Sequence, residues 1–156
     1  MSIFQSKSAE MLVSKHLLGK KYAVYIPLAD VGVDLIVEPP EPKRHKFIGI
    51  QVKTSSYQRK PDWWAWIITK DDRRKNSSFF YVLCFEDINE LPNQIRDKRE
   101  GDVLCAVIPY EELVSFIKGR PRNKWIENGN FNLCAKKKGV VLEFLMPYLN
   151  NWDILG

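Results

Sequence analysis

Two alternating runs of residues, separated by a proline-rich octet, constrain the fold of this 156-residue chain more than any other feature. Residues 33–38 read Val-Asp-Leu-Ile-Val-Glu and residues 47–53 read Phe-Ile-Gly-Ile-Gln-Val-Lys, with aliphatic residues at every second position. A period of two is typical of a β-strand. Residues 39–46 between them contain three prolines, which cannot continue a hydrogen-bonded ladder. The sequence therefore predicts a β-hairpin with the octet as its loop.

The apolar pattern also predicts which residues of the hairpin face each other. If Glu38 pairs with Phe47, one face is wholly apolar and is formed by the pairs Val37–Ile48, Leu35–Ile50 and Val33–Val52. On the opposite face Asp34 then lies directly across from Gln51, at roughly 5 Å between Cβ atoms, with Lys53 one step further along. A slip by one residue would bury these polar groups among aliphatic side chains, so the pattern protects the register.

The remaining segments predict helices around a central sheet. Helical spacing of apolar residues predicts a helix from residues 6–8 to 18 and another over 110–117. Strands are predicted at 21–26, 79–85 and 103–109, and residues 63–69 form either a strand or a short buried helix. Residues 130–133 and 140–142 predict a late hairpin, and residues 144–155 a C-terminal helix or cap. The expected class is α/β, a mixed central β-sheet flanked by helices, in a single domain over residues 1–156.

The composition places the chain among ordinary globular proteins, with 45% hydrophobic and 28% charged residues. No apolar run approaches the roughly 20 residues of a membrane span, so we expect no membrane association. The N-terminus lacks a secretory layout, and Cys84 and Cys105 lie in apolar runs, which together favour the reducing cytoplasm. Two histidines and no paired cysteine spacing argue against structural zinc. The formal net charge of +5 favours polyanionic partners.

The polar side of the hairpin offers oxygen ligands for a hard cation. Mg²⁺ prefers one or two carboxylates together with water and substrate phosphate. Asp34 is the strongest candidate ligand, Gln51 offers an amide oxygen, Val52 a backbone carbonyl, and Glu10 on the first helix a water-mediated or second-site contact. Such a metal would polarise a phosphate and lower the pKa of a bound water. Lys53 would orient that water or offset charge on the phosphoryl oxygens.

The order of these residues resembles a known nuclease superfamily. Glu10 on a helix, Asp34 in Gly32-Val33-Asp34-Leu35, and Gln51-Val52-Lys53-Thr54-Ser55 are similar to the PD-(D/E)XK, or restriction-endonuclease-like, nucleases. Within this superfamily the motif residues resemble those of a small uncharacterised bacterial subgroup related to Holliday-junction resolvases. By that resemblance Glu10 matches the helix acid, Asp34 the hairpin aspartate, Gln51 the second acidic position and Lys53 the motif lysine. The resemblance implies a restriction-endonuclease-like fold and a DNA endonuclease that uses Mg²⁺ or Mn²⁺, as a homodimer in many members.

Gln51 departs from the usual Asp or Glu and removes one negative charge from the site. The alternative function is a catalytically inactive nucleic-acid-binding or assembly module that retains the nuclease-like fold. A role in toxin systems or phage defence is not separable from the first function. Taken singly, the residues also have structural explanations: Asp34 as a turn cap, Lys53 as a strand-edge charge and Glu10 as a partner of the helix dipole.

Basic clusters and an aromatic run leave two interpretations open. The clusters lie at 43–46, 73–75, 118–124 and 136–138, and each forms either a solvated face or a set of phosphate contacts. Trp63, Trp64 and Trp66 either stack on bases or pack in the core. The hydroxyls that follow Lys53, at Thr54, Ser55, Ser56 and Tyr57, are candidates for contacts with phosphate oxygens.

Overall fold

The computed structural model describes residues 3–29, 32–41, 46–70, 78–120, 125 and 128–156. Its elements follow in the order α1 (Ile3–Gly19), β1 (Ala23–Tyr25), β2 (Leu35–Glu38), β3 (Ile48–Ser55), β4 (Trp63–Thr69), β5 (Phe79–Phe85), η2 (Ile88–Glu90), α2 (Asn93–Arg96), β6 (Cys105–Pro109), α3 (Tyr110–Lys118), β7 (Asn130–Lys136), α4 (Val140–Leu145), η3 (Met146–Tyr148) and η4 (Trp152–Leu155).

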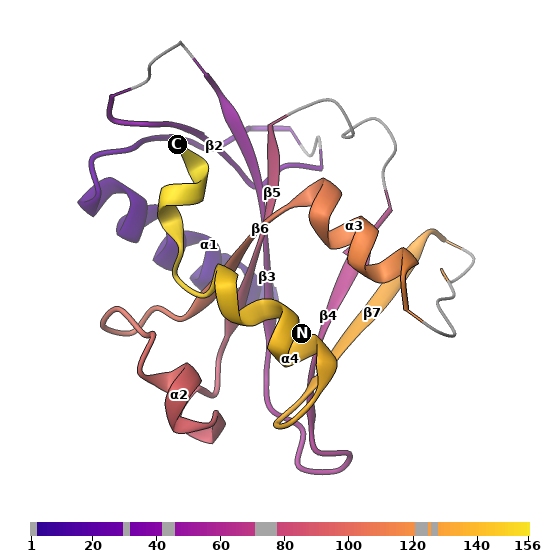
Figure 1. Ribbon diagram of the computed structural model, residues 1–156. Coiled ribbons are helices and arrows are strands. Elements are labelled where there is room, and N and C mark those ends of the chain that lie inside the picture. The colour runs from indigo at the N-terminus through magenta and orange to yellow at the C-terminus, as the bar shows by residue number, and fades with distance from the viewer. Residues whose placement is uncertain (1–2, 30–31, 42–45, 71–77, 121–124, 126–127) are drawn as a thin grey trace.

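A five-stranded mixed sheet lies at the centre of the fold (Figure 1), in the order β1-β2-β3-β5-β6. β1, β2 and β3 pair antiparallel, β5 joins β3 in parallel, and β6 pairs antiparallel with β5. β4 leaves this sheet and pairs with β7 as a separate antiparallel ribbon. The expected α/β class, with a mixed central sheet flanked by helices, is confirmed.

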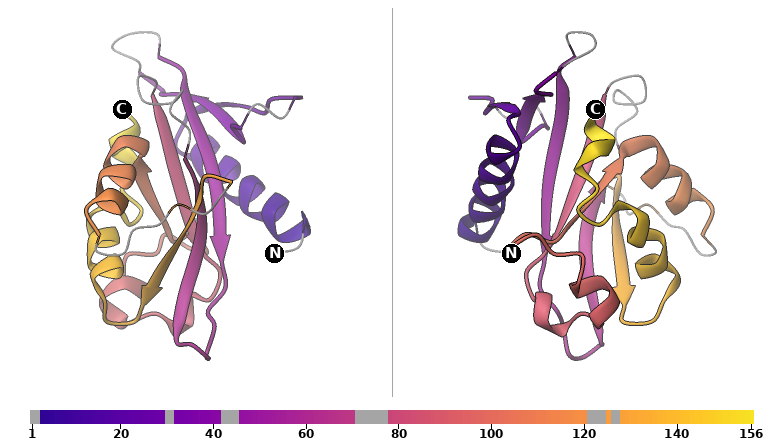
Figure 2. Two further views of the ribbon diagram at one scale, coloured as in Figure 1. Left: turned by 90° about the vertical axis from the view of Figure 1, so that its right-hand side faces the viewer. Right: turned by 60° about the vertical axis from the view of Figure 1, so that its left-hand side comes forward.

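Alternate side chains of β5 enter two separate hydrophobic clusters. Tyr81 and Leu83 belong to a cluster beneath α3, α4 and the β4–β7 ribbon, whereas Phe80 and Val82 belong to a cluster beneath α1. Figure 2 shows α1 on one side of the main sheet and α3 and α4 on the other. Because both faces of β5 are covered, all seven of its residues are buried, as its uninterrupted apolar sequence predicts.

The predicted hairpin register is confirmed for three pairs: Leu35–Ile50, Ile36–Gly49 and Val37–Ile48. The predicted Val33–Val52 pair is wrong. β2 begins at Leu35, and Val33 turns to the other face, where its methyl carbons lie 3.5 and 3.6 Å from the position that a Cβ on Gly49 would take. Gly32 precedes this bend with a φ of 74°, a conformation that glycine adopts at little cost.

The predicted late hairpin is also wrong. Residues 130–136 form a strand, but its partner is β4, which settles residues 63–69 as a strand, and residues 140–145 form the helix α4. Helical spacing brings Val141, Leu142 and Leu145 into the core, and the inner residues of β7 pack beside Trp64 and Trp66. A short apolar run fits both the strand period of 2 and the helix period of 3.6. Here the segment forms a helix because its apolar residues are buried against the ribbon.

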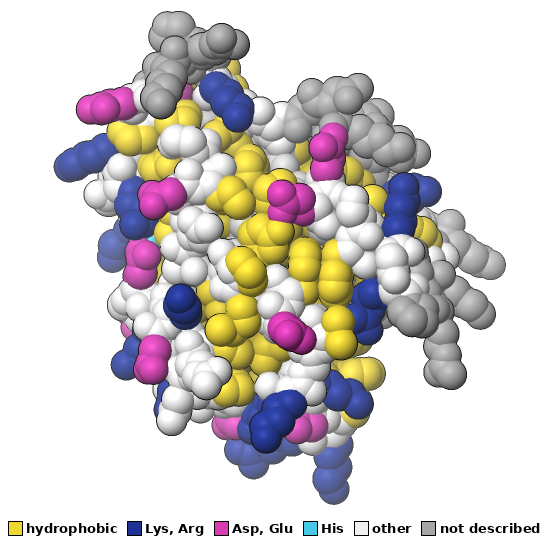
Figure 3. Space-filling model, in the orientation of Figure 1, with side chains coloured by type: hydrophobic (Ala, Val, Ile, Leu, Met, Phe, Trp, Pro, Cys, Tyr) yellow, Lys and Arg dark blue, Asp and Glu magenta, His cyan; other side chains and the backbone are white. Residues whose placement is uncertain are grey.

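Apolar side chains gather in a band on the face that carries α3, α4 and the C-terminal segment (Figure 3). Phe116 of α3 stacks on Phe144 of α4 with ring centroids 3.9 Å apart and an interplanar angle of 6°. The stack joins the two helices over the cluster that they cover. No helix in the described part of the chain has the length and apolar character that a membrane crossing requires.

Asn150 fastens the C-terminal segment to the edge of the sheet. Its backbone N–H donates to the carbonyl oxygen of Cys105 at 2.8 Å, and its side-chain oxygen accepts from the Cys105 N–H at 3.2 Å. Its Nδ2 donates to the carbonyls of Lys98 and Val103, both at 2.8 Å. Asn150 has a φ of 47°, which asparagine tolerates better than most residues.

We predict that Asn150→Ala lowers the free energy of unfolding by roughly 2–4 kcal/mol, because it removes three side-chain hydrogen bonds that each contribute about 0.5–1.5 kcal/mol. Urea denaturation measures the change. The matched control is the exposed neighbour Asn151, whose side chain donates a hydrogen bond to the carbonyl of Pro147. Asn151→Ala should cost less than about 1 kcal/mol, and equal losses in the two variants would contradict the anchoring role of Asn150.

Candidate functional site

The carboxylate of Asp34 is bound to the backbone of β3. Its Oδ2 accepts a hydrogen bond from the N–H of Val52 at 2.8 Å, and its own N–H donates to the carbonyl of Ile50 at 2.9 Å. The pairing between β2 and β3 ends at Leu35–Ile50, so the predicted direct pairing of Asp34 with Gln51 is not formed. The Asp34 side chain instead contacts the backbone of Val52, the residue after Gln51. Because charged acceptors form the stronger hydrogen bonds, the contact fixes Asp34 beside residues 51–53.

The carbonyl of Val52 points toward the same edge of β3 as Asp34. In an extended strand the N–H and C=O of one residue point to the same side, and the N–H of Val52 points at the Asp34 carboxylate. Among the described residues the pairing of β2 with β3 stops at Leu35–Ile50. The edge of β3 at Val52 therefore lies past the last residue pair of the two strands. The structure therefore places a carboxylate and a backbone carbonyl at one strand edge, the two oxygen types that the sequence predicts there.

Gln51 and Lys53 point to the face of the sheet opposite α1. Their parallel neighbours on β5 are Tyr81 and Leu83, which belong to the cluster beneath α3, α4 and the ribbon. Val52 lies between them in sequence and enters the cluster beneath α1. The alternation of β3 thus separates its polar and apolar side chains in the predicted way.

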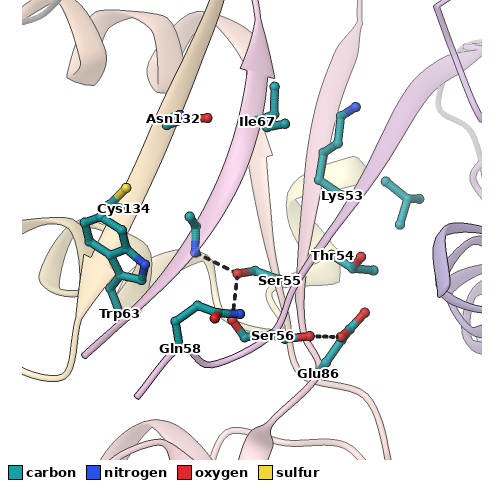
Figure 4. A pocket seen from close by; sticks show the side chains of 12 residues that line it. Lys53, Thr54, Ser55, Ser56, Gln58, Trp63, Ile67, Glu86, Asn132 and Cys134 are labelled. Atoms are coloured by element: carbon teal, nitrogen blue, oxygen red, sulfur yellow. Dashed lines mark hydrogen bonds between the residues drawn. The ribbon is translucent and has the colours of Figure 1, made fainter. Parts of the chain in front are cut away.

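Lys53 lines a cleft of about 590 Å³ between β3 and the ribbon. In Figure 4, Lys53 lies on the β3 side, and Trp63, Asn132 and Cys134 lie on the opposite side. Val52 also contributes to the wall, and Asp34 contacts Val52 at the strand edge. The cleft exists because β4 departs from β3 after the connecting turn and pairs with β7 instead.

Ser55 and Ser56, two of the hydroxyls predicted to reach phosphate, form hydrogen bonds within the protein. Ser55 is buried, and its Oγ accepts from the N–H of Ala65 at 2.7 Å, a contact that ties β4 to β3 where the ladder between them is absent. Ser56 donates to the carboxylate of Glu86, which also lines the cleft (Figure 4). Thr54 is buried as well. Sequence reasoning missed Glu86, because it follows β5 and only the parallel crossover brings it beside β3.

Glu10 comes from the other side of the sheet. Its helix packs on β3 through Ala9, Val13 and Leu17, in the cluster that contains Val52. The Glu10 side chain is 14% exposed and lies 3.3 Å from the ammonium of Lys7. Among the described residues the Glu10 carboxylate pairs with Lys7, and its helix covers the face of β3 opposite Lys53. Asp34 reaches β3 through its contact with the Val52 N–H, so Glu10 lies apart from that edge.

The oxygen atoms at this edge suit a hard cation that takes only a few of its ligands from the protein. Within the described residues there is no group of three or more histidine, cysteine or acidic side chains that could hold a metal. The edge instead combines one carboxylate with neutral oxygens, and Oδ1 of Asp34 has no hydrogen-bond donor among the residues that the structure describes. Mg²⁺ commonly binds through one or two carboxylates and completes its shell with water and phosphate, so the residues present fit it.

Thiol chemistry is not favoured in the cleft. Burial raises the pKa of the Cys134 thiol, and the positive charge of Arg120 lowers it by less. Cys134 therefore stays protonated at neutral pH, whereas the thiolate is the reactive form. The candidate groups on the β3 side are therefore the oxygens of Asp34 and Val52 and the side chain of Lys53.

Comparison with solved structures identifies a protein of similar architecture. A bacterial homing endonuclease, I-Ssp6803I, matches with a TM-score of 0.57 and 16% sequence identity, over 97% of this chain and 90% of that chain. The two chains share a fold. No protein-family model and no curated protein sequence matches the chain. The likeness therefore concerns the path of the backbone, and the side chains of the site are argued from their own geometry.

We predict that Gln51→Glu strengthens Mn²⁺ binding on the order of tenfold, since a second negative charge near a cation contributes about 1 kcal/mol or more at short range. Isothermal titration calorimetry measures the affinity directly. Gln58→Glu is the matched control, because Gln58 lines the same cleft but is exposed on the turn after β3. Unchanged affinity in Gln51→Glu, or an equal gain in Gln58→Glu, would argue against a metal at the Asp34 edge.

Proposed function

We propose that this protein is a metal-dependent DNA endonuclease that hydrolyses phosphodiester bonds by attack of an activated water. The observation that carries the proposal is the Asp34 carboxylate, held on the Val52 N–H at the edge of β3, with Lys53 next in sequence and facing the cleft. The fold shared with a homing endonuclease supports a nuclease. The positive net charge suits a polyanionic substrate.

Each residue has a distinct part in the proposed reaction. Asp34 and the carbonyl of Val52 supply ligands, and Gln51 supplies an amide oxygen from the same strand. A bound Mg²⁺ or Mn²⁺ would polarise the phosphate and lower the pKa of a water. Lys53 orients the attacking water and offsets the charge that grows on the phosphoryl oxygens. The water oxygen bonds to phosphorus while the bond to one sugar oxygen breaks, and that oxygen leaves with a proton.

The order of Glu10, Asp34, Gln51 and Lys53 supports a place in the PD-(D/E)XK superfamily, in the subgroup related to Holliday-junction resolvases. In this proposal Glu10 acts through water or at a second ion, since its helix lies across the sheet from Lys53. In this proposal the chain acts as a single domain in the cytoplasm. All three cysteines are unpaired, which suits a reducing compartment that also contains DNA.

A homodimer is the simplest way for this protein to cut both strands, since one site acts on one strand. Two copies would then convert supercoiled plasmid to linear product with a rate that rises more steeply than the protein concentration. A single copy would accumulate nicked circles.

A second candidate is a catalytically inactive nucleic-acid-binding or assembly module with the same fold. Gln51 in place of an acid favours it, as does the lack of a three-ligand cluster among the described residues. This module would bind DNA in a salt-sensitive manner without binding Mg²⁺ or Mn²⁺.

We predict that the protein nicks supercoiled plasmid in Mg²⁺ or Mn²⁺, stops in EDTA, and loses at least about 100-fold in rate in Asp34→Asn and in Lys53→Met. Asp34→Asn keeps an oxygen for the Val52 N–H and removes only the charge, and Lys53→Met keeps the aliphatic stem. Agarose-gel time courses measure the rate, and DNA affinity in Ca²⁺ should stay within about threefold, because phosphate contacts elsewhere dominate binding.

Asp97→Asn is the control, since Asp97 is exposed at the end of α2 and outside the cleft. It should cut like the unmodified protein. Cleavage that survives in both Asp34→Asn and Lys53→Met would refute the mechanism. DNA binding without cleavage or metal binding in the unmodified protein would instead select the inactive module.

A further inference from the structure

The β4–β7 ribbon has one buried and one open face. Trp64, Trp66 and Ile68 of β4 enter the core with Leu133 and Ala135 of β7. The alternate residues face outward as the pairs Trp63–Lys136, Ala65–Cys134 and Ile67–Asn132. All of them except Lys136 line the cleft. The inner face packs the ribbon on the core.

The open face combines an apolar contact surface with amide groups. Ile67 is 52% exposed, and Asn132, its direct partner across the ribbon, is exposed as well. Both lie on the ribbon side of the cleft, opposite Lys53 (Figure 4). The pair leaves an isoleucine side chain and a primary amide side by side, roughly 5 Å apart at Cβ.

We propose that this face of the ribbon enters the major groove of duplex DNA and reads base edges there. The proposal rests on the proposed endonuclease function and names its recognition element. Strands about 5 Å apart form a ribbon that fits a groove about 12 Å wide, and seven paired residues span roughly 20 Å of it. Asn132 has the donor and acceptor that match adenine, and Ile67 offers an apolar contact for the methyl group of a neighbouring thymine.

Charges around the ribbon suit a phosphate backbone on both sides of that groove. Lys53 faces the cleft from β3, and Lys136 is exposed at the opposite end of the ribbon beside Trp63. The ammonium of Lys137 lies 4.9 Å from the centroid of the Tyr57 ring, which holds a second cation at that end. The cleft also contains the carboxylate of Glu86, which accepts a hydrogen bond from Ser56.

Selection from a randomised duplex library tests the proposal, with Asp34→Asn protein as the binding background so that bound DNA stays intact. Fluorescence anisotropy then compares the selected duplex with a scrambled one. Asn132→Ala should reduce the ratio of the two affinities by roughly 5- to 100-fold while leaving the scrambled duplex unaffected. Lys136→Ala should weaken both duplexes alike and lower the salt dependence by about one phosphate contact.

Asn89→Ala is the matched control, because Asn89 is exposed on η2 and away from the ribbon. It should leave the affinity ratio unchanged, and thermal melting checks that each variant is folded. An unchanged ratio in Asn132→Ala, no sequence selected, or stronger binding to single strands would overturn the ribbon proposal. If plasmid nicking still depends on Asp34 in that case, the endonuclease stands without the ribbon. No DNA binding by the unmodified protein would overturn both.

Discussion

The hydrogen bond from the Val52 N–H to the Asp34 carboxylate is the interaction on which the proposed chemistry depends. It ends the ladder between β2 and β3 with a side chain and so holds a negative charge at the edge of the sheet. The carbonyl of Val52 lies at the same edge, and Lys53 follows on the face that opens to the cleft. Without this bond, Asp34 would be an ordinary turn residue before a strand.

The departure of β4 from the main sheet gives that edge its surroundings. β3 pairs with β5, which comes after β4 in sequence, and β4 leaves the main sheet to pair with β7. Ser55 replaces part of the missing ladder by accepting from the Ala65 N–H. One side of the ribbon completes the core and the other bounds the cleft. The pairing of β4 with β7 therefore both stabilises the fold and shapes the candidate site.

Local patterns in the sequence predict the hairpin and the candidate ligands, because a period of two and three prolines leave one register that buries aliphatic residues on one face. They do not predict partners that are distant in sequence. Residues 130–136 read as a strand, but their partner could not be read from alternation, and residues 140–142 fit either period. Glu86 reaches the cleft only through the parallel crossover, and Val33 changes face because the chain bends at Gly32. Packing between distant segments decided each of these cases.

Anomalous diffraction from a crystal soaked in Mn²⁺ tests the central claim most directly. The account predicts one strong peak at coordination distance, roughly 2.1 Å, from Oδ1 of Asp34 and the carbonyl oxygen of Val52. The same soak of Asp34→Asn crystals should show no peak at this edge. A peak elsewhere in the molecule, or none in the unmodified protein at saturating Mn²⁺, would contradict a metal-dependent site on β3.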